Sequence, residues 1–265
     1  MFRFLVISCA LIAALPLAAQ ENDLKQVALK SVQDYVIRPA RESGAAFELV
    51  AEPIVRFTEL KIDEGDVLIW TRDGRPEVAA QVFLFGDGAN KIWLHEFQSL
   101  SSEPLVLQRG GRTLWEPSEK GVAWTRLPAD FAPADSPAGR LTQMKRLARR
   151  FTGDEQTPGV TNDSENLKNF EMRMKPREVF RYASPGNGTT DGAVFSFVME
   201  NRADPELLLL IEAHVTDGQA GWRYAVAPLS CWPMQIMLDG EEIASIPNRL
   251  QKSTASQPYH VWVWP

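Results

Sequence analysis

Residues 65–100 constrain the fold of this chain most strongly. They form three apolar runs separated by two groups of turn residues, at 72–75 and 86–88. Glycine tolerates positive φ angles and aspartate bonds its own backbone, so Asp-Gly groups between β-rich runs are typical of hairpins. The pattern therefore predicts a three-stranded antiparallel meander. It is a signal of fold and carries no information about function.

Residues 1–19 have the features of a secretory signal peptide. One early cation, Arg3, precedes an apolar run over 4–15, and small residues separate that run from the polar segment beginning at Gln20. The run is shorter than the roughly 20 residues that span a bilayer. We expect cleavage after Ala19 and export to the periplasm, the cell envelope or the extracellular space. Cys9 lies within the apolar run, where lipid attachment is not expected.

Removal of this leader leaves 246 of the 265 residues, with Cys231 as the only cysteine, so no intramolecular disulfide is expected. An apolar core must then hold the fold, and 45% of the residues are apolar. The leader contains one of the 28 cations, which leaves 27 against 34 acidic residues and a net charge of −7. This balance argues against a nucleic-acid partner. No later segment is predicted to span a membrane.

Further short elements are predicted around the meander. Helical spacing of apolar residues predicts an amphipathic helix over 23–37 that ends before Pro39. The polar segment 152–166 is predicted to be a surface loop, and 121–127 to extend a hairpin. The remaining predicted strands lie at 47–50, 54–60, 105–107, 113–115, 178–182, 193–199, 207–215, 222–227 and 259–264.

The proline-rich segment 128–137 is the best candidate for a linker, because a central strand cannot continue through its three prolines. We expect a first half at 20–127, with the N-terminal helix and the β-meander. The second half, at 138–265, contains a basic helix and further strands. The predicted fold class is mainly β with a few helices (α+β). It is built from antiparallel meanders, as one large domain or as two pseudo-repeated halves.

A sequence echo favours two related halves. Residues 65–70 read GDVLIW and are followed by Pro76-Glu77, while residues 192–197 read GAVFSF and are followed by Pro205-Glu206. The offset is 127 residues at the glycines and 129 at the prolines. A common period would indicate a duplicated unit. The alternative is that any two hairpins with a Pro-Glu start look alike.

The strong catalytic and metal-binding motifs are missing from the sequence. Alternation places Glu212 and His214 on one face of a strand, where they could act as acid and base or bind a metal. His95 could complete a set of two histidines and one carboxylate. The alternative is that Glu212 and His214 are solvated at a strand end and that His95 is a hydrogen-bonded structural residue. We predict no cofactor and no metal.

Two surfaces are candidates for non-catalytic binding. His260, Trp262 and Trp264 share one face of the last strand, where they could stack on sugar rings, receive a partner strand or pack within the core. The predicted helix after Pro137 carries a row of cations that could face an anionic surface or pair with acidic loops such as 154–155. These cations are Arg140, Lys145, Arg146, Arg149 and Arg150.

The segments 70–77, 95–97 and 191–193 resemble a family of exported bacterial proteins with no assigned activity. The resemblance implies export and a bacterial origin, and it transfers no site residues. We expect an exported non-catalytic protein that binds an unknown envelope component, glycan or protein through a β surface or the cleft between halves. The alternative is a hydrolase or metal-dependent enzyme using His95, Glu212 and His214. A third reading is a helper of a membrane or secretion assembly that uses the basic helix.

Overall fold

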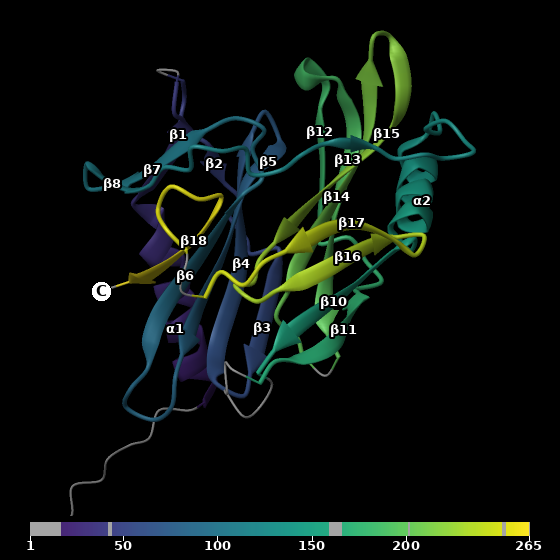
Figure 1. The fold of residues 1–265 in the computed structure, drawn as a ribbon. Coiled ribbons are helices and arrows are strands. Elements are labelled where there is room, and N and C mark those ends of the chain that lie inside the picture. The colour runs from purple at the N-terminus through teal and green to yellow at the C-terminus, as the bar shows by residue number, and fades with distance from the viewer. Residues whose placement is uncertain (1–16, 42–43, 159–165, 201, 251–252, 265) are drawn as a thin grey trace, which may run out of the picture.

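A computed structural model describes residues 17–41, 44–158, 166–200, 202–250 and 253–264 (Figure 1). Strands make up 52% of it and helices 11%, and the strands pair antiparallel, which confirms the predicted mainly β fold. The predicted leader lies outside the described residues except for 17–19, which belong to the first helix. In the described ranges, no helix is both long and apolar enough to span a membrane.

The first large sheet has six strands in the order β18-β6-β5-β4-β2, with β3 beside β4. The predicted meander is confirmed as β4, β5 and β6, and the β4–β5 turn has positive φ angles at Asp73 and Gly74. The last strand, β18, returns to pair with β6. The strands are β2 (Glu48–Leu49), β3 (Val55–Glu59), β4 (Ile62–Arg72), β5 (Arg75–Phe85), β6 (Ile92–Ser99) and β18 (Tyr259–Trp264).

The second large sheet has nine strands in the order β17-β16-β10-β11-β13-β14-β15-β9, with β12 beside β13. Its strands are β9 (Thr125–Arg126), β10 (Phe151–Thr157), β11 (Lys168–Met174), β12 (Phe180–Ser184), β13 (Thr189–Met199), β14 (Leu207–Thr216), β15 (Gln219–Pro228), β16 (Met234–Leu238) and β17 (Glu241–Ile246). The division at 128–137 stays a prediction. Each sheet contains one strand from the other side of this segment: β9, which precedes it, joins the second sheet, and β18, which follows it, joins the first.

Three predictions of local structure need correction. Residues 121–127 do not extend the hairpin at 105–115, because Thr125 and Arg126 form β9 and pair with β15 of the second sheet. The N-terminal helix α1 spans Leu17–Gln33 and is followed by strand β1 (Tyr35–Pro39), because burial of Tyr35 and Ile37 against β7 (Leu105–Arg109) overrides the helical spacing. Strand β7 also pairs with β8 (Arg112–Trp115). The supposed loop at 152–166 begins with β10, which lies between β11 and β16. Pairing with distant strands orders this polar segment, and residues 159–165 lie outside the described residues.

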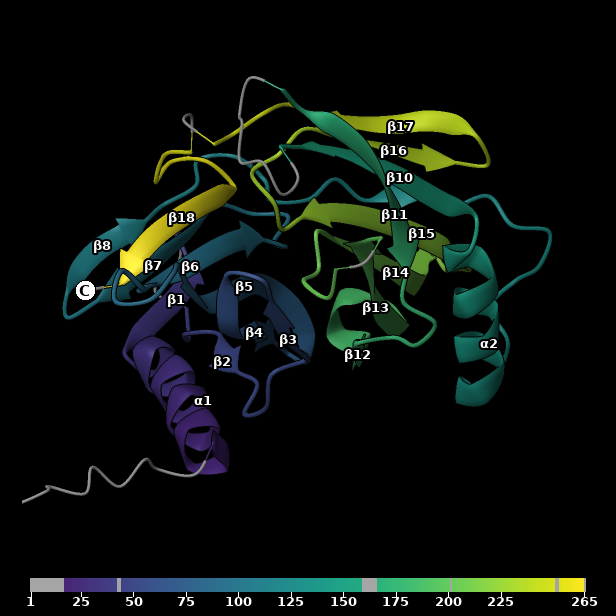
Figure 2. The ribbon, with the colours of Figure 1, turned by 90° about the horizontal axis from the view of Figure 1, so that it is seen from below.

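The two large sheets pack face to face, with α1 outside the first and α2 (Pro137–Ala148) beside the second (Figure 2). Leu68 and Trp70 on β4 belong to an apolar cluster that includes residues of α1. Val67 and Ile69, on the opposite face, pack in a cluster with residues of β14. Because both faces of β4 are covered, its sequence is a continuous apolar run rather than an alternating one.

The sequence echo corresponds to two sets of four strands with the same neighbours. Strands β3, β4, β5 and β6 pair consecutively, as do β12, β13, β14 and β15. Val78 pairs with Ser99 in the first set. Leu207 pairs with Pro228 in the second, so both partners are shifted by the same 129 residues. The two sets therefore share strand order and register.

The echoed glycines have the same role in both sets. Gly65 lies opposite Phe57 and Gly192 lies opposite Tyr182 on the neighbouring strand. A Cβ atom would lie 2.4 Å from the Phe57 ring at Gly65, and 2.5 Å from the Tyr182 ring at Gly192. Each glycine therefore makes room for an aromatic ring that covers the strand.

We expect Gly65→Ala and Gly192→Ala each to lower the free energy of unfolding by about 1–3 kcal/mol, because the added methyl group overlaps an aromatic ring. Urea denaturation measures this change. The matched control is Gly221→Ala on β15, where a Cβ atom would meet no heavy atom within 4 Å. Equal urea midpoints for all three variants would contradict the proposed role of the echoed glycines.

Candidate functional site

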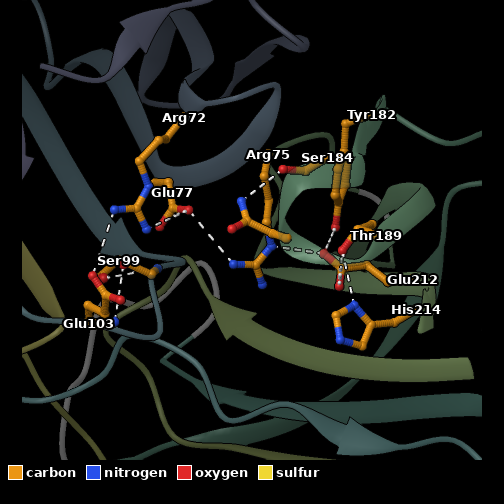
Figure 3. A network of polar contacts seen from close by, with 12 residues as sticks. Arg72, Arg75, Glu77, Ser99, Glu103, Tyr182, Ser184, Thr189, Glu212 and His214 are labelled. Carbon is orange, nitrogen blue, oxygen red and sulfur yellow. Dashed lines mark hydrogen bonds and ion pairs between the residues drawn. The ribbon is translucent and has the colours of Figure 1, made fainter. Parts of the chain in front are cut away.

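Glu212 is the centre of a buried polar network between the two halves (Figure 3). Its Oε1 atom accepts hydrogen bonds from Arg75 Nε at 3.0 Å and from the Tyr182 hydroxyl at 2.9 Å. Its Oε2 atom accepts from Arg223 Nε at 2.6 Å and from the Thr189 hydroxyl at 3.2 Å. Four donors match the roughly four lone-pair sites of a carboxylate. Glu212 is therefore saturated and has no free position from which to remove a proton.

Trp124 lies against the same two cations. The guanidinium carbons of Arg75 and Arg223 lie 4.8 and 4.6 Å from the centre of its ring. Arg75 comes from the first half and Arg223 from the second, while Trp124 lies near the end of the first half, directly before β9. Cation–π contacts of partly desolvated guanidinium groups are stabilising. The network therefore holds the two halves together.

Glu212 and His214 lie on one face of β14, as the alternation predicts, and both contact Thr189. The His214 Nδ1 atom is 3.3 Å from the Thr189 hydroxyl oxygen. The single hydroxyl proton of Thr189 goes to Glu212, so His214 must donate to Thr189 and cannot accept its proton. Burial, followed by the charge of Arg223, lowers the pKa of His214. The arrangement does not provide a nucleophile activated by a base.

The structure does not bring His95 to this pair. His95 is fully buried on β6 and faces α1, where its Nδ1 atom is 2.7 Å from the Tyr35 hydroxyl and its Nε2 atom is 3.1 Å from the Ser31 hydroxyl. Ser31 donates its own proton to the Ala28 carbonyl, so it accepts from His95 Nε2. Burial lowers the pKa of His95 to about 3. It is a neutral structural histidine, and its neighbour Glu96 points the other way, toward the second half.

The cations of the basic helix mostly pair with acidic groups of the protein, and none of these partners is in 154–155. The Arg140 Nε atom donates a hydrogen bond to the Asp191 carboxylate, which also accepts one from Arg181. Arg149 is exposed. The N–O distances are 2.9 Å for Arg140 with Asp191, 2.8 Å for Lys145 with Glu178, 3.5 Å for Arg146 with Asp130 and 2.5 Å for Arg150 with Asp239. Most of this charge is therefore neutralised internally.

The aromatic row on β18 is partly covered by the first half. Trp264 stacks on His95 with ring centres 6.3 Å apart, and Trp262 packs against the apolar cluster beneath α1. His260 is paired in register with Phe97 and is also partly buried. The side chain that β18 presents to solvent is Val263, which is 53% exposed. The row thus contributes packing between β18 and its neighbours.

Four carboxyls lie at the seam, the region where the first sheet faces the second, and no sequence motif indicates them. Glu155 and Glu206 are buried, and Glu96 and Asp204 are half-buried. Burial raises the pKa of Glu96 to about 8, of Glu155 to about 7 and of Asp204 to about 6, and raises that of Glu206 well above its ordinary value. The carboxyls also raise one another's pKa values, and Arg202 offsets this effect in part. Within the described ranges, no group of three or more His, Cys, Asp or Glu side chains is arranged to hold a metal ion.

A cavity of about 590 Å³ lies at the same seam. One wall comes from β15 and β17 of the second sheet, and the other from Gln98, residues 118–123 and 256–259. Backbone hydrogen bonds join these two segments, from Glu116 N to the Ala255 carbonyl and from Ser118 N to the Ser256 carbonyl. Ser118, Glu119 and Lys120 are exposed, so the cavity reaches the surface. Both halves therefore contribute to one open site.

Comparisons of the chain with protein-family models, with curated proteins and with solved structures gave no match. The functional argument therefore depends on the geometry of the seam, and the resemblance to exported bacterial proteins stays a prediction.

We expect the free energy of unfolding to fall as the pH rises from about 6.5 to about 8, above the range in which the opposite contribution of His95, whose pKa is lowered to about 3, changes with pH. The seam carboxyls bind protons more tightly in the folded than in the unfolded chain, so their stabilisation is present at low pH and is lost as the pH passes their raised pKa values. Urea denaturation across this range measures the slope. Glu96→Gln should flatten it, whereas Glu48→Gln, at an exposed position, should not. An unchanged slope in Glu96→Gln would refute the assignment.

We expect Glu212→Gln to destabilise the protein by about 3–5 kcal/mol, because it leaves the cations Arg75 and Arg223 without their shared carboxylate. Arg75 keeps a second, longer contact with Glu77, at 3.7 Å, which places the effect toward the lower end of that range. Urea unfolding at pH 7 gives the value, with Glu241→Gln at an exposed position of β17 as the matched control. A loss similar to that of the control would show that the network does not hold the halves together.

Proposed function

We propose that this is an exported, non-catalytic binding protein that holds a small ligand in the cavity between its two halves. The cavity is the observation that carries the proposal. Its volume of about 590 Å³ falls within the range of about 300–1,000 Å³ that is usual for small-molecule sites. Its lining combines apolar side chains with a similar number of polar ones, so the site offers both kinds of contact to a ligand.

The apolar part of the lining comes mainly from the second sheet. Val226 on β15 and Ile243 and Ile246 on β17 are only partly buried by the protein, and all three line the cavity. Val122, which lies between β8 and β9, lines the same cavity. A ligand that covered these side chains would bury further apolar surface, which favours binding by about 25 cal/mol for each Å².

The polar groups near the seam support binding more than catalysis. Glu212 is saturated by four donors, and His214 donates to Thr189 rather than accepting from it. His95 faces the opposite side of the first sheet. The alternative of a hydrolase or metal-dependent enzyme built on these three residues has no shared site to support it. Export rests on the leader at 1–19 and makes a small envelope component the expected ligand.

We expect the neutral fluorescent probe phenylnaphthylamine to bind with its fluorescence enhanced, and Val226→Trp to weaken binding by about tenfold or more because the larger side chain fills the cavity. Fluorescence titration measures both affinities. The control is Val215→Trp, at an exposed position of β14 that does not line the cavity. Absence of binding, or equal weakening by the two variants, would overturn the proposal.

A further inference from the structure

Arg249 brings a cation to the wall of this cavity. It follows β17, and its backbone N–H donates to the Cys231 carbonyl at 2.7 Å, which fixes its position on the second half. Its guanidinium carbon lies 4.9 Å from the centre of the Tyr259 ring, and both residues line the cavity. Tyr259 belongs to β18 of the first sheet. The cation therefore lies where the two large sheets meet.

The guanidinium group lacks an acceptor. In the part of the chain that the structure describes, no carboxylate or carbonyl forms an ion pair or hydrogen bond with the Arg249 side chain. The groups that act on its charge are Tyr259 and Cys231, and burial lowers its pKa. Because Arg249 is only partly buried, water can solvate its five donors, and these donors stay available to an anionic group that enters the cavity. This distinguishes Arg249 from Arg75, Arg140, Arg150 and Arg223, which all bond carboxylates.

We propose that the cavity binds an anionic amphiphile, a molecule with one carboxylate, sulfonate or phosphate group beside an apolar body, and that Arg249 binds the anionic group. This inference rests on the proposed function. The planar guanidinium group suits these anions because it can donate two parallel hydrogen bonds. Val226, Ile243 and Ile246 would contact the apolar body.

The other polar groups of the lining are consistent with this ligand. Gln98 is 1% exposed, and its Oε1 atom has no hydrogen-bond partner among the described residues, so it can accept from a ligand hydroxyl or amine. Lys120 and Glu119 are both exposed at the rim, and their opposite charges compensate each other. Glu96 faces the Tyr259 hydroxyl, and burial keeps its carboxyl largely neutral below a pKa of about 8. Asp204 and Glu155, with pKa values of about 6 and 7, carry negative charge at pH 7, but neither lines the cavity.

A matched pair of probes tests the inference. Anilinonaphthalene sulfonate and phenylnaphthylamine have closely similar aromatic bodies, and only the first carries an anionic group. We expect the unsubstituted protein to bind the anionic probe about tenfold more tightly than the neutral one, since hydrogen bonds to charged groups are the stronger class. Arg249→Gln should remove this preference and leave the affinity for the neutral probe unchanged. Arg249→Lys, which keeps the charge, should retain part of it.

Fluorescence titration at pH 7 gives all of these affinities, and binding of the neutral probe reports that each variant is folded. The control variant is Arg112→Gln, at an exposed position of β8 away from the cavity. Equal affinities for the two probes, or a preference that survives Arg249→Gln, would overturn the role of Arg249 while the proposed function stands. If neither probe binds the unsubstituted protein, both proposals fail.

Discussion

The pairing of the Glu212 carboxylate with Arg75 of the first half and Arg223 of the second is the interaction on which the arrangement of the two sheets depends. A buried charge costs several kcal/mol unless it is paired and hydrogen-bonded, and four donors meet that requirement here. The donors come from four different strands, so the carboxylate is stable only when the two halves are docked in one register.

Much of the fold could be predicted from the sequence, because its strands are bounded by turn chemistry that acts locally. The meander at 65–100 is an example, since Asp-Gly groups define its turns without reference to the rest of the chain. Strand β10 could not be predicted, because its polar residues are ordered by pairing with β11 and β16, which follow later in the sequence. Strand β1 was missed for the same reason, since only its distant partner β7 distinguishes it from an extension of α1.

The site was harder to predict than the fold. Period-two alternation correctly placed Glu212 and His214 together, but it gave no indication of which sheet face meets the other half. The sequence pattern therefore indicates His95 as a candidate, whereas its neighbour Glu96 faces the seam. Arg249 lies outside regular structure and belongs to no motif, so its environment depends entirely on the return of the chain to the first half. The signal that could have indicated the seam was the repeated Pro-Glu pair, whose glutamates, Glu77 and Glu206, are both buried.

The return of β18 to the first sheet has a consequence for folding during synthesis. Strand β6 has β18 as a neighbour, so an edge of the first sheet stays uncovered until residues 259–264 have left the ribosome. The first half therefore cannot complete its sheet before the second half has been made, and the usual order of folding, N-terminal domain first, does not apply to it. The pairing joins residues separated by more than half of the chain, a contact pattern associated with slow folding.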